Sequence, residues 1–118
     1  MKYCELIING IDVLESKNAV NCYKYNGGSY DWKDENGYYH LIINGVDVLE
    51  GKKAVWCNKY DDGSYEWKDE KEYCHLVING IDVLECKNAV WCYEYDDGSY
   101  EWEDEKGLWH RVIDGVEV

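Results

Sequence analysis

Apolar and polar positions alternate along short stretches of the chain, and glycine-containing turns separate these stretches. In HLIINGVDVL, residues 40–49, two runs rich in β-branched residues flank the dipeptide Asn44-Gly45. This dipeptide suits a two-residue type I′ turn, because both central positions need positive φ. The turn places Ile43 opposite Val46. The alternation therefore predicts a half-buried antiparallel strand pair, not a helix.

A second kind of hairpin follows the first. In AVWCNKYDDGSYEWKDE, residues 54–70, the turn falls at Asp62-Gly63. A two-residue turn at this position pairs Tyr60 with Tyr65 and predicts one aromatic face and one charged face.

The two hairpins together form a unit of 35 residues that recurs along the chain. The second and third copies agree at 26 of 35 positions. A fixed period of this size is typical of repeat proteins, in which each unit buries its apolar face against its neighbours. We therefore expect a single β-repeat domain, residues 1–118, with units 3–37, 38–72 and 73–107 and a partial unit 108–118.

The partial unit decides between an open and a closed fold. It repeats only the first hairpin, around Asp114-Gly115, and brings the total to about seven hairpins. A ring of threefold symmetry, such as a β-trefoil or a β-prism, needs whole units. The surplus hairpin favours an all-β tandem hairpin repeat arranged as an open meander or hairpin stack, and the closed threefold fold is the alternative.

Charge narrows the choice of partners. The net charge is −13, from 25 acidic and 12 basic residues. This excess disfavours direct binding to nucleic acid or to an anionic membrane. No apolar stretch approaches the roughly 20 residues of a membrane helix, and the amino terminus lacks the apolar run of a signal peptide. We therefore expect a cytoplasmic protein.

The six cysteines follow the repeat without being kept in every copy. Cys86 occupies the repeat position at which the first two copies have Ser16 and Gly51. Cys4 and Cys74 share another repeat position, at which the second copy has Tyr39. A disulfide framework does not tolerate such replacements between units, so free and partly buried thiols are expected. No spacing gathers metal ligands, and neither a metal nor another cofactor is predicted.

Three histidines share one register, His40, His75 and His110. A general base repeated in every unit needs a nucleophile or second carboxylate beside it, and the spacing supplies none. We interpret the histidines as packing or surface residues, and we do not expect an enzyme.

The third unit differs most from the others. It holds nine acidic and two basic residues, against eight and five in the second unit. The expected register also sets Glu94 opposite Glu101, a like-charge pair that destabilises a strand ladder. A surface that faces a basic partner explains such a pair. The predicted contacts are Glu94, Asp96, Asp97, Glu101, Glu103, Tyr95 and Tyr100.

These observations favour a non-enzymatic binding protein whose acidic β-surface engages a basic protein. One form of this hypothesis is an inhibitor or counter-defence protein that imitates the charge of nucleic acid. The first alternative is a small-ligand binder that holds a carbohydrate, a cationic or a nucleotide-like molecule between Trp and Tyr rings of neighbouring hairpins. The second alternative is a structural repeat that associates with itself through exposed strand edges. The oligomeric state is left open.

Overall fold

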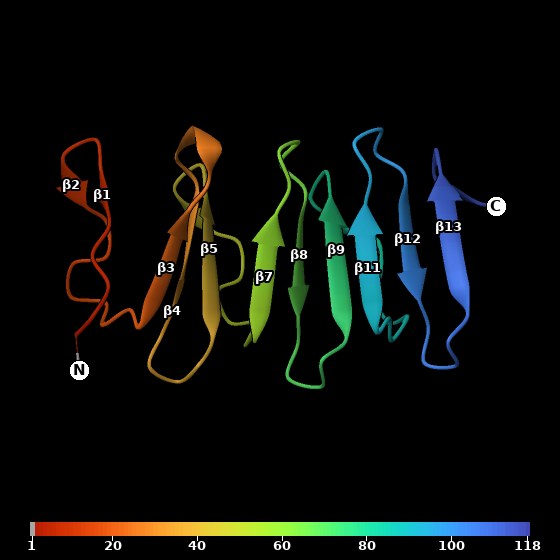
Figure 1. The fold of residues 1–118 in the computed structure, drawn as a ribbon, viewed down its shortest axis with the longest axis horizontal. Coiled ribbons are helices and arrows are strands. Elements are labelled where there is room, and N and C mark those ends of the chain that lie inside the picture. Colours follow the sequence, from red (N-terminus) through yellow and green to blue (C-terminus); the bar gives the residue numbers. More distant parts are fainter. Residues whose placement is uncertain (1) are drawn as a thin grey trace. The chain divides into compact units, whose positions relative to one another are not determined.

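A computed structural model describes residues 2–118, and its regular structure is almost entirely β (Figure 1). A short 3₁₀ turn, η1 at Asn26–Gly28, interrupts the strands. No helix within residues 2–118 has the length and apolar character needed to cross a membrane. The strands are β1 (Ile7–Ile8), β2 (Ile11–Asp12), β3 (Asn21–Lys24), β4 (Tyr30–Lys33), β5 (Tyr39–Ile43), β6 (Val46–Asp47), β7 (Trp56–Lys59), β8 (Tyr65–Lys68), β9 (Cys74–Ile78), β10 (Ile81–Asp82), β11 (Trp91–Glu94), β12 (Tyr100–Glu103), β13 (Trp109–Ile113) and β14 (Val116–Glu117).

The strands form three antiparallel sheets of four strands each, preceded by the hairpin β1–β2. The sheets have the orders β3-β4-β5-β6, β10-β9-β8-β7 and β11-β12-β13-β14. Each sheet therefore joins the second hairpin of one repeat to the first hairpin of the next. The predicted tandem hairpin repeat with an open arrangement is confirmed. The closed threefold alternative is wrong, because none of these sheets closes into a barrel within the part of the chain described.

The chain separates into two compact units, Met1–Cys57 and Asn58–Val118, and the boundary falls within β7. The first unit contains β1–β2 and the sheet β3–β6. The second contains the strands from β8 onward. These two parts are the first and the second unit, as distinct from the 35-residue repeats, and the expectation of one domain stays a prediction.

The first type of hairpin has the predicted register. Ile43 lies opposite Val46, and the turn residues Asn44 and Gly45 have φ values of 51° and 79°. Two successive positive φ angles define the type I′ turn that the Asn-Gly dipeptide favours. The period-2 alternation therefore fixes which side chains lie inside, and Leu41 is fully buried.

The second type of hairpin differs from the prediction by one residue. In β11–β12, Glu94 lies opposite Tyr100, and Glu101 lies opposite Tyr93. The reason is the loop, which has three residues between Tyr95 and Ser99 and ends in Gly98 at φ 86°. A turn followed by a left-handed glycine is the usual three-residue hairpin loop. The expected Glu94–Glu101 pair is therefore wrong.

The same loop occurs in the second repeat. The amide of Tyr60 donates to the carbonyl of Ser64 over 2.8 Å, so Tyr60 does not pair with Tyr65 as expected. A one-residue change of register moves every side chain of one strand to the other face relative to its partner.

Each unit has its own small apolar core. In the first unit Leu14 and Ala19 pack on Trp32. In the second unit Leu76, Leu84 and their neighbours pack on Trp102. Partly buried tyrosines, among them Tyr30 and Tyr100, pack against these clusters.

Candidate functional site

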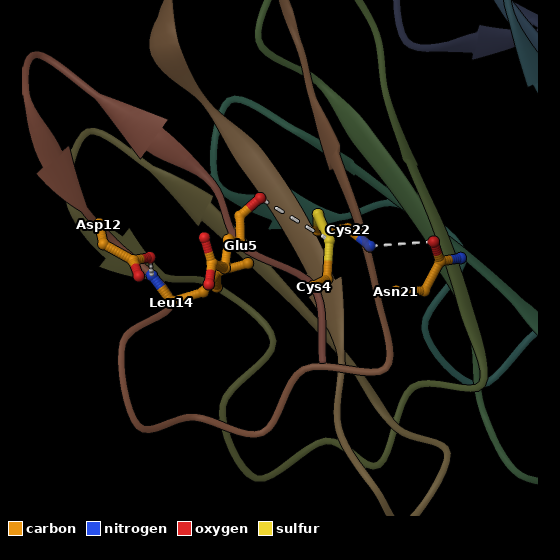
Figure 2. Close-up of a disulfide and its surroundings, with 6 residues drawn as sticks. All are labelled: Cys4, Glu5, Asp12, Leu14, Asn21 and Cys22. Atoms are coloured by element: carbon orange, nitrogen blue, oxygen red, sulfur yellow. Dashed lines mark hydrogen bonds between the residues drawn. A yellow bond between two sulfur atoms is a disulfide. The ribbon is translucent and has the colours of Figure 1, made fainter. Parts of the chain in front are cut away.

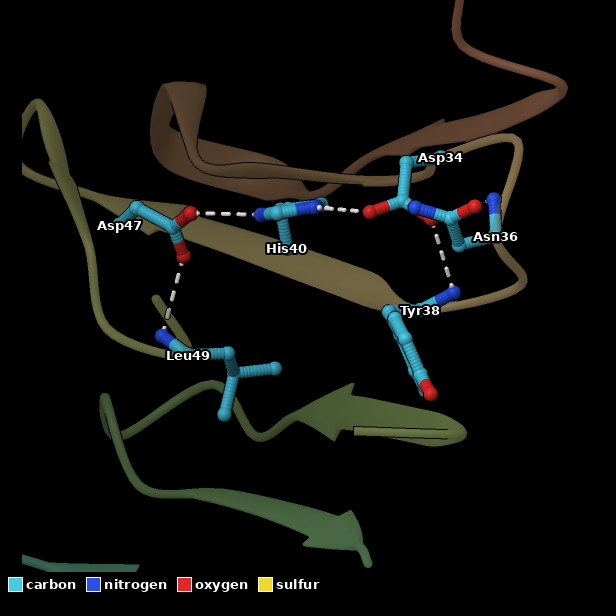
Figure 3. Close-up of polar contacts among 6 residues, drawn as sticks. All are labelled: Asp34, Asn36, Tyr38, His40, Asp47 and Leu49. Carbon is cyan, nitrogen blue, oxygen red and sulfur yellow. Dashed lines mark hydrogen bonds and ion pairs between the residues drawn. The ribbon is translucent and has the colours of Figure 1, made fainter. Parts of the chain in front are cut away.

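A histidine held between two carboxylates recurs in all three sheets, and Figure 3 shows the first example. The Nδ1 atom of His40 lies 2.7 Å from Oδ2 of Asp47, and its Nε2 atom lies 2.9 Å from Oδ2 of Asp34. The imidazole also stacks on Trp32, with ring centroids 4.1 Å apart. The two further examples are His75 with Asp69 and Asp82 on Trp67, and His110 with Asp104 and Glu117 on Trp102.

The same aspartates also shape the backbone. Oδ1 of Asp34 accepts hydrogen bonds from the amides of Asn36 and Tyr38, and Oδ1 of Asp47 accepts one from Leu49 (Figure 3). One oxygen therefore orders a turn while the other orients the ring. Both carboxylate oxygens of Asp34 and of Asp47 therefore have hydrogen-bond partners within the protein, which supports the interpretation of the histidines as structural residues.

These contacts change the charge states. Although burial opposes the charged ring, hydrogen bonds to Asp34 and Asp47 raise the pKa of His40. The pKa of Asp34 is lowered: burial alone would raise it, but the hydrogen bonds from His40 and two backbone amides outweigh that effect. The pair therefore behaves as an ion pair over a wider pH range than free side chains.

The cysteines depart from the prediction at one position. Cys4 and Cys22 form a disulfide, with Cα atoms 6.3 Å apart (Figure 2). Their expected free state is wrong, because the amide of Cys4 bonds to the carbonyl of Ala19 and brings this segment beside β3. Disulfides persist mainly in oxidising compartments. The other four cysteines, Cys57, Cys74, Cys86 and Cys92, are free thiols.

The third sheet presents an exposed surface of aromatic and charged residues, which we call the outer face. It is formed by side chains that alternate with buried ones along β11, β12 and β13. The strand register sets them in two rows across the sheet, and the exposed fractions of Trp91, Tyr93 and Trp109 are 39, 42 and 55%. The rows are Trp91, Glu103 and Trp109, and Tyr93, Glu101 and Arg111.

Ring contacts order the outer face. The Trp91 ring stacks nearly parallel to Tyr93, and its centroid lies 5.1 Å from that of Trp109. The hydroxyl of Tyr95 donates a 2.5 Å hydrogen bond to Glu101, and the guanidinium of Arg111 lies over the Tyr95 ring at 5.2 Å. Four aromatic rings therefore surround the carboxylates on this face.

The corresponding face of the preceding sheet is covered. Its acidic residue Glu66 is 7% exposed, and Oε2 of Glu66 accepts a hydrogen bond from the Cys92 thiol over 3.1 Å. Leu76, which corresponds to Arg111, is fully buried, and β11 lies against β9. In the second unit the outer face is thus the exposed counterpart of a buried surface.

The first unit repeats the covered arrangement. Asp31 is 7% exposed, and the Cys57 thiol lies 3.7 Å from its Oδ2 atom. Although hydrogen bonds from Tyr25 and Cys57 oppose it, burial raises the pKa of Asp31. At the corresponding position, Glu101 is half-buried and lies on the outer face.

A pocket of about 280 Å³ opens beside the loops of the second unit. Its residues carry four carboxyl groups and one ammonium group. We call it the loop pocket, and its lining is Lys59, Tyr60, Asp61, Asp62, Glu94, Tyr95 and Asp96.

Glu94 occupies the inner wall of the loop pocket and is only 3% exposed. Burial and the neighbouring Asp62 raise the pKa of Glu94 to about 7. Its Oε2 atom has no hydrogen-bond partner among residues 2–118. The predicted role of Glu94 as a surface contact is therefore wrong, because the register turns its side chain inward.

The other predicted contacts are divided between two surfaces. Tyr100 lies on the inner side of its sheet and packs on the buried cluster, so its expected surface role is not supported. Asp96 and Asp97 are exposed in the loop, and Asp97 accepts a hydrogen bond from the Ser99 amide. Tyr95, Glu101 and Glu103 are half-buried and lie at or on the outer face.

Four residues of the outer face are not among the contacts predicted from the sequence: Trp91, Tyr93, Trp109 and Arg111. One signal in the sequence distinguishes Arg111, because it occupies the repeat position at which earlier repeats have Leu41 and Leu76. A charged residue at a core position indicates a surface that the next repeat does not cover. Asp62 had no such signal, since its proximity to Glu94 arises only in the folded chain.

No group of three or more His, Cys, Asp or Glu side chains within residues 2–118 is arranged to hold a metal ion. Comparison with protein-family models and with curated protein sequences finds no match to this chain.

Proposed function

We propose that this chain is a non-enzymatic binding protein whose outer face engages a basic segment of a partner protein. The observation that carries the proposal is the exposure of Trp91, Tyr93 and Trp109 around Glu101 and Glu103. Exposed aromatic residues of this number are uncommon on a surface without a partner.

The chemistry of the outer face suits lysine and arginine side chains. Cations are attracted to the faces of Trp and Tyr rings, and the carboxylates of Glu101 and Glu103 lie between the rings in the strand register. The approach of Arg111 to the Tyr95 ring is an example of this contact within the chain. A net charge of −13 steers a basic partner toward the protein over long distances.

Tryptophan fluorescence with short peptides tests the proposal. We expect a lysine- and arginine-rich peptide to change the emission at low salt, and a glutamate-rich peptide of equal length to have no effect. The affinity should fall steeply as ionic strength rises, because salt screens exposed charges. Equal responses to both peptides, or no response at low salt, would contradict the proposal.

The loop pocket favours a second candidate function, the binding of a small organic cation. Its support is the buried Glu94 carboxyl, which has an unpartnered oxygen and lies beside Asp62 and Asp96. An alkylammonium ion added to the protein should bind less tightly to a Glu94→Gln variant, as measured by calorimetry. A Glu101→Gln variant serves as the control, because Glu101 does not line the loop pocket.

The two functions are separated by these variants. Binding of the basic peptide should depend on Glu101 and Glu103, whereas binding of the ammonium ion should depend on Glu94. Light scattering on the same samples detects the remaining alternative, self-association of the repeat, as an increase in mass with concentration.

A further inference from the structure

Cys74 and Cys92 in the second unit occupy the same repeat positions as the bonded Cys4 and Cys22 in the first. Each pair is separated by 18 residues, and the two pairs are two repeats apart. Because the repeats fold alike, the geometry that joins one pair is expected at the other.

The backbone supports this equivalence. The amide of Cys4 donates to the carbonyl of Ala19 over 2.7 Å, and the amide of Cys74 donates to that of Ala89 over the same distance. Both alanines are fully buried. The bridge holds each cysteine beside the strand that carries its counterpart.

The side chains of Cys74 and Cys92 lie in the same part of the core, where the Cys92 thiol also donates to Oε2 of Glu66. They belong to one buried cluster and are 3 and 5% exposed. Contact with the Cys92 thiol lowers the pKa of Cys74, and the same contact together with burial raises the pKa of Cys92. Cys74 is therefore the thiol of this pair that ionises first, and the thiolate is the form that attacks a disulfide.

We propose that Cys74 and Cys92 form a second intrachain disulfide when the folding chain meets a low-molecular-weight disulfide such as oxidised glutathione. The Cys74 thiolate attacks one sulfur of the oxidant, forms a mixed disulfide and releases one small thiolate. The Cys92 sulfur then attacks the Cys74 sulfur and loses its proton, which forms the intrachain bond and releases the second small thiolate. The two cysteine protons pass to the two released thiolates, and the oxidant gains two electrons.

The bond has a consequence for the outer face. It links the start of β9 to β11, and β11 carries Trp91 and Tyr93. Closing a loop of this length restricts the unfolded chain and opposes the separation of β11 from the core. Oxidation should therefore hold the exposed aromatic rings in place.

The second repeat is a built-in control. Tyr39 stands where Cys4 and Cys74 stand, opposite the free thiol Cys57. Its backbone makes the same bridge, because the amide of Tyr39 donates to the carbonyl of Ala54 over 2.8 Å. The wild-type chain cannot join these positions, but a Tyr39→Cys variant should form a bond to Cys57.

The experiment refolds the reduced, full-length protein in a buffer of reduced and oxidised glutathione, which gives the buried thiols access to the oxidant. Free thiols are then alkylated under denaturing conditions, and the linked peptides are identified by mass spectrometry. We expect links Cys4–Cys22 and Cys74–Cys92, with Cys57 alkylated. The melting temperature should exceed that of the Cys92→Ser variant by on the order of 10 °C.

Two variants make the result decisive. Cys86→Ser removes an exposed thiol of the same unit and should leave the Cys74–Cys92 link intact. Tyr39→Cys should add a link to Cys57 and shows that the repeat geometry permits a bond. Alkylation of both Cys74 and Cys92 under conditions that join Cys4 to Cys22 would overturn the proposal. A link from either of them to Cys86 would overturn it as well.

Discussion

Glu94 and Asp62 both line the loop pocket, and the pKa values of their carboxyl groups shift in opposite directions. Burial and Asp62 raise the pKa of Glu94 to about 7. Burial alone would raise the pKa of Asp62, but hydrogen bonds from Ser64 and Glu94 lower it. Below a pH of about 7 Glu94 is therefore protonated in the folded chain, whereas Asp62 stays ionised to a lower pH than usual.

This pair predicts that a Glu94→Gln variant is more stable than the wild type at alkaline pH. In the unfolded chain Glu94 ionises near its usual pKa of 4.5, whereas in the folded chain it ionises near about 7. The stability of the wild type should therefore fall as pH rises between these values and stay lower above them. The glutamine side chain of the variant cannot ionise, so we expect a gain on the order of 1–3 kcal/mol at pH 8.

Urea unfolding at several pH values measures this difference. At pH 4 the Glu94 side chain is mostly protonated in folded and unfolded chains, and the two proteins should agree closely. A Glu85→Gln variant removes one exposed carboxylate and should show no such trend. An equal difference at pH 4 and pH 8 would show that ionisation of Glu94 is not its cause.

The histidine between Asp69 and Asp82 leads to a second prediction. A His75→Phe variant keeps a ring that can stack on Trp67 but loses both hydrogen bonds to carboxylates. Hydrogen bonds to charged partners contribute about 1.5–3 kcal/mol each. Because these side chains are partly exposed to water, which weakens the two bonds, a loss of about 2–4 kcal/mol is expected at pH 6.

The pH dependence identifies the cause of that loss. Although burial opposes it, contacts with Asp82 and Asp69 raise the pKa of His75 above its usual 6.5. The stabilisation is present in full below 6.5 and disappears as pH rises through the raised value. Asp69 has a lowered pKa, so its contribution disappears as pH falls below its usual 3.8 and through that lowered value. His40→Phe is the matched control and should behave alike; a loss independent of pH would indicate packing alone.

The two kinds of turn explain how far the sequence predicts the fold. Asn44-Gly45 specifies a two-residue loop, and the register that it implies is the one observed. The sequence Asp96-Asp97-Gly98 also contains an Asp-Gly dipeptide, but here only the glycine has positive φ. A local dipeptide therefore gave the position of the second hairpin correctly and its register incorrectly.

The candidate site was harder to predict, because it depends on which faces are covered. The one-residue register error placed Glu94 on the surface, although it is buried opposite Tyr100. The acidic positions Glu66 and Glu101 are identical in sequence, yet Glu66 is covered and Glu101 lies on the outer face. Only the packing of successive sheets distinguishes them.

The outer face gives a third prediction, which concerns Glu101 and Glu103. Replacing both by Gln should weaken the binding of a lysine- and arginine-rich peptide by about 2- to 30-fold, since each exposed ion pair contributes about 0.2–1 kcal/mol. The remaining affinity should depend less on salt. Fluorescence titration at low and high ionic strength measures both effects.

A matched pair of variants controls for net charge. Glu85→Gln with Glu105→Gln removes the same charge from exposed turns outside the outer face. This control should bind the peptide with nearly wild-type affinity. If it weakens binding as much as the outer-face variant, the peptide responds to total charge and not to the outer face.

Arg111 gives the fourth prediction, an increase in self-association when its charge is removed. Its counterparts Leu41 and Leu76 are fully buried, whereas Arg111 is exposed beside Trp109 on the outer face. A charged side chain on an exposed sheet face opposes its pairing with another chain. An Arg111→Leu variant should therefore form dimers or larger species at concentrations where the wild type does not, as measured by light scattering. Arg111→Lys keeps the charge and should scatter light like the wild type. If both variants associate, positive charge alone does not prevent pairing. The guanidinium group, through its contact with the Tyr95 ring, would then be the feature that keeps the outer face from pairing.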